Sequence, residues 1–588
     1  MSIVALKSLV LIGFSEQKEA VYEALQELGC LHLVSLDSAS GGVSNVALGD
    51  ATIEAWQLLK RWHIDGTRPA SVGQLSLMEV QERALELEQR MERLNDELEL
   101  VEARIKEVEP WGDFEFSSLE SMGGLSLWFY LIPHHRVSEL SDLDWVWQEV
   151  GKDHRHCYVV VIARDEPLGF ESERQHLGKD SLSTLRGRKA EVEDALSHAQ
   201  IEGAELAREL PRFVEHIMQL QDVGERSRAV QMGYEGAGMF AVKAWVPGEK
   251  VETVQEVADG YQLARVVEDV RDDEQPPTLF ENPASTQVGE SLISFYMTPS
   301  YRLWDPSFVV LYSFTLFFAM IMSDAGYGVV MAVLLGVFWK RIESANVKHL
   351  CLLLTISTLV WGVLVGSYFG IEPDGGSLFG MLHVLDMQDM DGMMALSIVI
   401  GAVHIMLANA IDAWRLRRSA AAWAPLGWIV VLFNALMIYL GGSHEGLKTA
   451  GGVGIVTGLV MIVIFTGAGQ GHGVMKQLGT GAMALTKLSE AFGNVLSYLR
   501  LFALGVASAA LAGAFNDLAS QANASVKGLG FLLAIVILLV GHTLNFILAI
   551  MSGFIHGLRL NLIEFFNWSV GEEGYAFRAF KKKNKPTN

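Results

Sequence analysis

The sequence predicts an α-helical polytopic membrane domain joined to a cytoplasmic α/β dumbbell with an antiparallel coiled-coil arm. The 588-residue chain has a mean hydropathy of +0.28, and only 19% of its residues are charged. Long apolar stretches are confined to residues 291–588, which contain 15 acidic and 18 basic side chains, against 53 and 27 in residues 1–290. The two parts are therefore suited to different solvents. We expect a cytoplasmic N-terminal domain at 1–290 and a transmembrane domain at 291–588.

Composition also excludes some classes of function. The acidic first part would repel phosphates, so we expect no nucleic-acid partner. The N-terminal segment "MSIVALKSLVLIGFSEQ" lacks the charged start and the cleavage site of a signal peptide, which predicts that the first part stays in the cytoplasm. Cys30, Cys157 and Cys351 are far apart in the sequence and predict neither a disulfide nor a metal site. The first part has no glycine-rich phosphate loop and no group of nucleophilic or metal-ligating residues. We expect no cofactor and no catalytic site in this chain.

The first part alternates short apolar runs with helical patterns. Residues 1–37 predict a β-α-β unit, and residues 238–270 repeat its rhythm. Strands near Leu125 and Cys157 predict a third piece between them. We expect a membrane-proximal lobe at 1–70 and 225–280, an arm at 75–110 and 172–224, and a distal lobe at 111–171.

Two heptad seams predict the arm. Apolar side chains alternate at spacings of three and four from Leu77 to Val108, and again from Val192 to Leu220. An antiparallel pair of such helices would be about 45 Å long at 1.5 Å per residue. Pro211 is expected to interrupt the second helix and bend the arm. The alternative is an ordinary helical hairpin within one compact domain.

The second part predicts eight membrane spans and cytoplasmic termini. Basic residues follow the even-numbered spans, for example Lys340 and Arg341 after the second and Arg415 after the fourth, which places those loops inside. The last two spans are long: a helix of about 32 residues measures about 48 Å, against a hydrocarbon core of about 30 Å, so we expect tilt. The expected spans lie near 306–322, 326–339, 350–368, 394–413, 425–441, 452–468, 484–515 and 529–566.

Polar stripes follow the last two spans. On the seventh, Arg500 is set among small side chains that would let another helix approach closely. An intramembrane charge is costly unless it faces a partner, a bundle interior or water, so two consecutive polar faces predict a polar pathway. The seventh-span stripe is Gly493, Ser497, Arg500, Ala503, Ala507, Ala510 and Ala514; the eighth-span face is His542, Asn545, Ala549, Ser552, His556 and Arg559.

Several of these residues have a structural alternative. Arg559 lies near the cytoplasmic end of its span, where it could be a snorkelling anchor. His542 and Asn545 fit hydrogen bonds between helices better than proton transfer. His404 and Asp412, two turns apart on the fourth span, could line an aqueous entry or be packed polar residues.

At these residues the chain resembles a known family. The segments "SYLRLFALGVASAALAG", "MSDAGYG", "WGVLVGSYFG" and "FIHGLRLNLIEFFNW" are similar to motifs of the a-type stator subunit of V-type rotary ATPases, called subunit I in bacteria and archaea. The resemblance covers essentially the whole chain, and the segment around Arg500 is its most specific part. It implies a multi-pass protein of a bacterial or archaeal cell membrane.

The resemblance also implies an ion-translocating stator. Arg500 would face a ring of proteolipid rotor subunits (c/K subunits), each with a carboxylate, and Arg559 would assist from the eighth span. The arm would hold peripheral stalks of E/G type, and the chain would bind no nucleotide. Two positions depart from some relatives: Ser508 stands where they have histidine, and Ala549 where they have glutamate. The candidate ion-translocation residues are Arg500, Arg559, His556, Ser552, Asn545, His542, Glu564, Glu490 and His404.

Two other functions are consistent with a charged membrane domain. A stand-alone secondary transporter could use Arg500 and Arg559 as binding groups, although transporters usually show internal repeats, and spans one to four do not resemble spans five to eight. A membrane scaffold without transport would leave the mid-span arginine without a role. The choice between H⁺ and Na⁺ rests mostly on the ring carboxylate, which belongs to another chain.

Overall fold

The computed structural model describes residues 2–36, 49–63, 76–114, 124–142, 144, 146–167, 173–178, 180–373, 376–387, 389–442, 444–468, 474–525 and 529–583. Parts of the expected lobes and arm, at 37–48, 64–75, 115–123 and 168–172, lie outside these residues. The chain divides into two compact units. One comprises Met1–Leu11, Cys30–Val34 and Lys243–Ala579, and the other Ile12–Gly29, Ser35–Val242 and Phe580–Asn588. These two units do not meet at residue 290, the expected boundary between the cytoplasmic and transmembrane domains. That boundary stays a prediction.

A five-stranded sheet of order β2-β8-β1-β9, with β7 paired to β8, is formed by the two expected β-α-β segments. Strands β2 and β8 are antiparallel, with His32 opposite Trp245. Gly29, in the left-handed region at φ 65°, ends α1 and turns the chain toward β2. The elements are β1 (Leu6–Phe14), α1 (Lys18–Leu28), β2 (His32–Val34), β7 (Tyr234–Gly236), β8 (Met239–Pro247), α7 (Val251–Gly260) and β9 (Ala264–Asp269).

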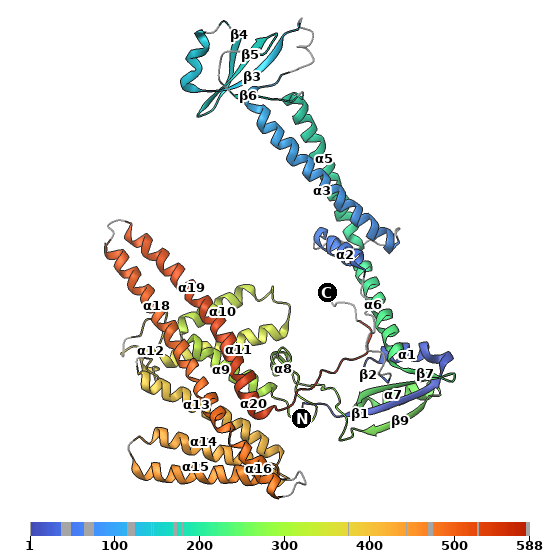
Figure 1. Cartoon of the computed structure of the whole chain (residues 1–588), viewed down its shortest axis with the longest axis vertical. Coiled ribbons are helices and arrows are strands. Elements are labelled where there is room, and N and C mark those ends of the chain that lie inside the picture. Colours follow the sequence, from blue (N-terminus) through green and yellow to red (C-terminus); the bar gives the residue numbers. More distant parts are fainter. Residues whose placement is uncertain are drawn as a thin grey trace. The chain divides into compact units, whose positions relative to one another are not determined.

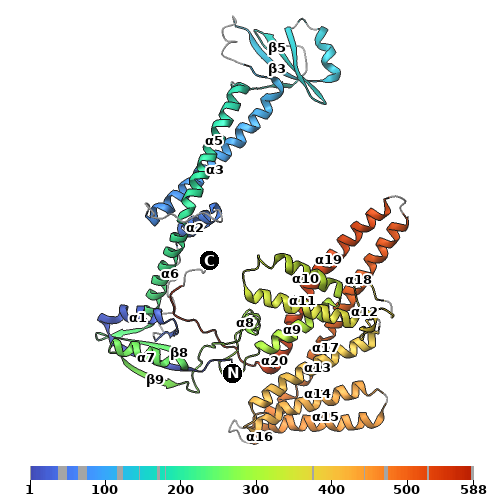
Figure 2. The same ribbon diagram turned by 180° about the vertical axis from the view of Figure 1, so that it is seen from behind.

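Two long helices, α3 (Leu77–Val108) and α5 (Leu182–Leu206), lie side by side and lead to a second sheet (Figures 1 and 2). They are antiparallel, since Arg90 of α3 pairs with Glu202 near the end of α5, whereas Glu109, directly after α3, pairs with Arg186 near the start of α5. A capping box between Ser76 and Glu79 starts α3 at the predicted residue. Whether the pair supercoils as a coiled coil stays a prediction.

Pro211 interrupts the second helix, as predicted. The 3₁₀ turn Ala207–Glu209 separates α5 from α6 (Leu210–Met232), and Pro211 stands in the first turn of α6, where its missing N–H costs nothing. The helix α2 (Asp50–Trp62) packs on the α3–α5 pair through Ala55 and Leu59. The second sheet has the order β4-β5-β3-β6, from β3 (Ser126–Pro133), β4 (Val146–Lys152), β5 (His156–Ala163) and β6 (Glu173–Gln175).

Among the described residues, six helical segments are long and apolar enough to cross a membrane, and they coincide with the third to eighth expected spans. The first two expected spans are the short helices α9 (Ser307–Met322) and α10 (Ala325–Phe338), which bend by 120° and would give a seventh span if counted together. The count of eight is therefore not confirmed. The remaining helices are α8 (Gln287–Ser294), α11 (Ala345–Val365), α12 (Leu378–Met381), α13 (Met390–Arg415), α14 (Trp423–Leu440), α15 (Glu445–Phe465), α16 (Val474–Ala484), α17 (Lys487–Ser497), α18 (Leu499–Ser525), α19 (Gly530–Arg559) and α20 (Phe566–Ser569).

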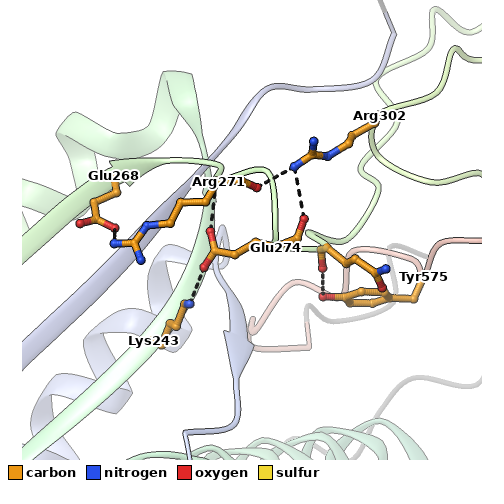
Figure 3. A network of polar contacts seen from close by, with 7 residues as sticks. Lys243, Glu268, Arg271, Glu274, Arg302 and Tyr575 are labelled. Atoms are coloured by element: carbon orange, nitrogen blue, oxygen red, sulfur yellow. Dashed lines mark hydrogen bonds and ion pairs between the residues drawn. The ribbon is translucent and has the colours of Figure 1, made fainter. Parts of the chain in front are cut away.

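A network of hydrogen bonds joins the segments that precede and follow the membrane helices (Figure 3). Glu274 accepts hydrogen bonds from Lys243 Nζ at 2.7 Å and from the backbone N–H of Arg271 at 3.3 Å. Lys243 lowers the pKa of Glu274 by hydrogen bonding to its ionised form. Arg302, which precedes α9, donates to the Arg271 carbonyl at 2.6 Å, and the Tyr575 hydroxyl, beyond α20, donates to the carbonyl of residue 275 at 2.9 Å. The residues before the first and after the last membrane helix are thus held together.

Candidate functional site

Arg500 lies at the start of α18, directly after a break in the seventh span. The helical pattern is interrupted at Tyr498, which separates α17 from α18. One face of α18 is buried against helices of this chain, and the face that carries Arg500 is turned outward. The buried residues are Leu501, Gly505, Ser508 and Ala512, whereas Ala503, Ala507, Ala510 and Ala514 are exposed. The predicted small-residue stripe is therefore a surface that this chain leaves open.

A carboxylate of the same chain lies between the two arginines. Glu564 Oε1 is 3.7 Å from Arg559 Nε and 4.0 Å from Arg500 Nη1, and the Glu564 side chain is 2% exposed. The Arg500 side chain is 24% exposed and that of Arg559 50%, so one side of the cluster opens outward. With Glu564 ionised, the three groups carry one net positive charge. This net positive charge allows the cluster to bind a second carboxylate from outside the chain.

A π-helical turn brings Glu564 to this position. Residues five apart in a regular α-helix are about 140° apart around the axis, because each residue turns by about 100°. Leu560–Phe565 is instead a π-helix, whose i→i+5 hydrogen bonds bring residues five apart toward one side. Arg559 and Glu564, five apart, can therefore meet. Arg500 Nη1, Glu564 Oε2 and His556 Nδ1 are buried without a hydrogen-bond partner among the described residues, which leaves donors and an acceptor available for a ligand.

His404 contacts two residues that are close in sequence to members of this cluster. Its Nδ1 is 2.7 Å from the hydroxyl of the buried Tyr498, and its ring stacks on Phe565 at 4.4 Å between centroids. Tyr498 precedes Arg500 by two residues, and Phe565 follows Glu564. Of the two roles considered for His404, the structure favours a packed polar residue, because its side chain is buried. Asp412 lies elsewhere on α13 and pairs with Arg415 at 2.9 Å.

The other predicted residues are not all brought to the arginines. His556 and Ser552 are half-buried on α19, and Glu490 is exposed on α17. Within the described parts of the chain, no hydrogen bond or ion pair joins Ser552 or Glu490 to either arginine. His542 and Asn545 belong to a second polar cluster in the same helices, where Asn545 bonds the Ser508 carbonyl at 2.9 Å.

Sequence reasoning missed several partners in that second cluster. Asp324, in the bend between α9 and α10, is 4% exposed and accepts four hydrogen bonds. Tyr327 contacts both His542 and Asn545 at 2.9 Å. Two quoted motifs, "MSDAGYG" and "WGVLVGSYFG", supply Asp324, Tyr327 and Ser367. A buried aspartate in an apolar segment was the signal that could have singled them out.

Comparisons with known proteins agree with the motifs. Residues 171–350 match the model of the V-type ATPase 116kDa subunit family. A V-type ATP synthase subunit I of Chlamydia pneumoniae is 26% identical over 86% of this chain and 86% of its own length. An A-type ATP synthase subunit I of Methanocaldococcus jannaschii is 29% identical over 59% of this chain, which spans 56% of that relative. A solved cytoplasmic N-terminal domain of subunit I, homolog of subunit a, of V-ATPase aligns with 44% of this chain and 99% of its own, at 17% identity and a TM-score of 0.22.

Proposed function

We propose that this chain belongs to the V-type ATPase 116kDa subunit family and is the membrane stator subunit of a rotary ATPase or ATP synthase. In this proposal it carries H⁺ or Na⁺ across the membrane where it meets a ring of proteolipid rotor subunits. It couples ion flow to rotation and anchors peripheral stalks. The names of the relatives, V-type and A-type ATP synthase subunit I, support the assignment to a rotary complex.

One observation carries the ion-translocating part of the proposal. The net positive cluster of Arg500, Arg559 and Glu564 adjoins the open, small-residue face of α18. A helix of another chain can approach that face closely, since alanine side chains add little bulk. A carboxylate on the approaching helix would then complete the charge balance of the cluster. A membrane scaffold without transport would bear the cost of this uncompensated charge without a function for it.

The proposed mechanism follows from the chemistry of guanidinium. Arg500 remains protonated at any working pH, so it acts as a fixed charge rather than as a proton carrier. A rotor carboxylate beside it is favoured in its ionised form, with its pKa lowered by about one to three units. The carboxylate therefore releases its ion on approaching Arg500 and binds another after passing it. Arg500 also blocks a direct leak between the two sides.

The arm has a mechanical role in this proposal. A stator must resist the torque of the rotor, and the antiparallel α3–α5 pair ends in the β3–β6 sheet, which we assign to the attachment of E/G-type peripheral stalks. Ion pairs between the helices, such as Glu97 with Arg188 at 2.5 Å, lie at exposed positions and contribute little stability each. The buried seam residues, Val80, Ala84 and Val192 among them, contribute more.

Replacing Arg500 with alanine tests the function. In vesicles that contain the whole complex, we expect R500A to leave assembly and ATP binding intact and to abolish ATP-driven ion uptake. The matched control is R418A. Arg418 is exposed in the loop after α13, so its substitution removes the same charge away from the cluster. Uptake by R500A close to that of R418A would refute the proposal. A chain that purified alone and moved a substrate without an ATPase would instead be a secondary transporter.

A further inference from the structure

Five residues close a ring of hydrogen bonds that links α10, α18 and α19, and a sixth, Asn545, bonds Tyr327. The five are Asp324, Tyr327, Phe369, Asn516 and His542, and together with Asn545 they are called here the helix clamp. Asp324 accepts the N–H of Phe369 at 3.0 Å, and the Phe369 carbonyl accepts Asn516 Nδ2 at 2.8 Å. Asn516 Oδ1 is 3.0 Å from His542 Nε2, and His542 Nδ1 is 2.9 Å from the Tyr327 hydroxyl. The Tyr327 N–H returns to Asp324 at 3.0 Å, which completes the ring.

The direction of each bond in the helix clamp is fixed by two backbone carbonyls. The Phe369 carbonyl can only accept, so Asn516 must turn its amino group toward it and its oxygen toward His542. His542 Nε2 must therefore carry a proton and donate. The Ser508 carbonyl likewise orients Asn545, whose amino group also donates to the Tyr327 hydroxyl at 2.9 Å. In the neutral imidazole, Nδ1 then accepts from the Tyr327 hydroxyl.

We propose that the helix clamp sets the register of α18 against α19, and that His542 and Asn545 are positioning residues rather than ion carriers. Both nitrogens of His542 are engaged in a neutral ring. Protonation of Nδ1 would remove the acceptor of the Tyr327 proton and leave the Tyr327 oxygen to accept from both His542 and Asn545. The inference rests on the proposed function only where ion uptake is measured, since the register of two helices can be measured without it.

The contact between α18 and α19 combines apolar packing with the polar bonds of the helix clamp. Gly541 of α19 lies against the Phe515 ring of α18, whereas the buried Gly505 and Ala512 of α18 meet Met320 of α9 and Gly370. This apolar contact carries no directional bond of its own against sliding by one helical turn, about 5.4 Å. Directional bonds at two levels, Asn516 with His542 and Ser508 with Asn545, resist it.

The helix clamp lies far enough from the arginines to act through the helices alone. Asn516 follows Arg500 by 16 residues, which corresponds to about 24 Å of α-helix, and His542 precedes Arg559 by 17 residues, or about 26 Å. A slip of α18 along α19 would carry Arg500 away from Glu564, where the distance is now 4.0 Å. The clamp therefore keeps both arginines at one level.

Two substitutions at His542 separate a positioning role from proton transfer. Glutamine cannot titrate, yet its oxygen can accept from Tyr327 and its amino group can donate to Asn516. We expect H542Q to keep ATP-driven ion uptake in the whole complex close to wild type. H542L removes both bonds, and we expect it to lower the number of ions moved per ATP hydrolysed. Uptake lost in H542Q with the helix register unchanged would overturn the proposal and make His542 a carrier.

The register itself is measured in the purified full chain in lipid nanodiscs. Spin labels at Ala507 on α18 and Met551 on α19, both exposed, report the distance between the helices in a background with Cys30, Cys157 and Cys351 replaced by alanine. We expect a broader distance distribution in H542L and in Y327F, and the wild-type one in Y312F, a control that removes an exposed hydroxyl from α9. Unchanged distributions in both H542L and Y327F would refute the clamp. If H542Q itself changes the distances, the Y327F distances become the test of the clamp. Y327F removes one bond of the clamp but leaves His542 able to titrate.

Hydrogen exchange gives a second measurement. D324N keeps the shape of the side chain but presents an amino group to the N–H of Gly370 or of Phe369, which now donate to Asp324 at 2.9 and 3.0 Å. We expect exchange at residues 367–371 to become at least about tenfold faster, which corresponds to about 1.4 kcal/mol. Exchange unchanged from wild type would contradict the clamp. A normal R500A uptake would sink the proposed function but would not alter these distances or exchange rates.

Discussion

Replacing Glu564 with glutamine tests how the charge cluster works. The change removes one negative charge that lies 3.7 Å from Arg559 Nε and 4.0 Å from Arg500 Nη1. At an effective dielectric constant of about 20, each attraction is worth about 4 kcal/mol before desolvation is subtracted. Arg559 is 50% exposed, so water screens its share strongly, and the desolvation of Glu564 offsets part of the rest. We expect E564Q to destabilise the membrane unit by about 3 kcal/mol.

The same substitution has a consequence for turnover. The net charge of the cluster rises from one to two, so a rotor carboxylate would be held more tightly and released more slowly. An additional attraction of about 1.4 kcal/mol slows release about tenfold. We expect E564Q to lower ATP-driven uptake about tenfold, measured in vesicles beside E573Q, which removes an exposed carboxylate after α20. Uptake by E564Q within twofold of E573Q would refute the reasoning, because the charge balance would then not control the site.

Three further predictions concern the rest of the chain. Replacing Ser76 with alanine removes the capping box of α3 and should lower the free energy of unfolding of the arm by about 1 kcal/mol by denaturant titration, whereas no loss would show that α3 does not depend on it. Backbone N–H groups of residues 155 and 156 lower the pKa of Asp153 to about 2. The stabilising effect of its ionised form should therefore be present above about pH 4 and lost as the pH falls toward 2. A D153N chain whose stability depends on pH as in wild type over this range would contradict this. Deleting residues 125–165, within the distal lobe, should weaken pull-down of peripheral-stalk proteins, and an unchanged yield would contradict the assignment of stalk attachment to the arm.

Local signals in the sequence predicted the two ends of α3 and the break before α6. The predicted apolar seam runs from Leu77 to Val108, and α3 has these same two ends; the capping box of Ser76 and Glu79 additionally fixes its start. Pro211 marked the break before α6 for a similarly local reason, its missing N–H. Such features depend on neighbours within one helical turn, so they can be recognised without knowledge of the tertiary structure.

Long-range contacts explain what the sequence could not predict. The bend between α9 and α10 depends on Asp324, which caps α10 but also accepts the Ser367 hydroxyl at 2.7 Å, 43 residues away. The π-helical turn that carries Glu564 has no local signature comparable to a cap. The polar face expected along α19 also divides, since His542 and Asn545 bond Tyr327 while Arg559 pairs with Glu564. A helix of 30 residues is long enough for one stripe to serve two clusters.

The charge count at the cluster changes what Arg500 requires from a partner. An isolated mid-span arginine would need a full counter-charge at all times, and a passing carboxylate could satisfy it only intermittently. In its ionised form, Glu564 supplies that charge from a position that is 2% exposed and shared with Arg559. The remaining positive charge is then divided between two guanidinium groups, which lowers the cost of the moments when no outside carboxylate is present. In the proposed stator, this sharing would let a rotor carboxylate both bind and leave, because neither the empty nor the occupied site is strongly unbalanced.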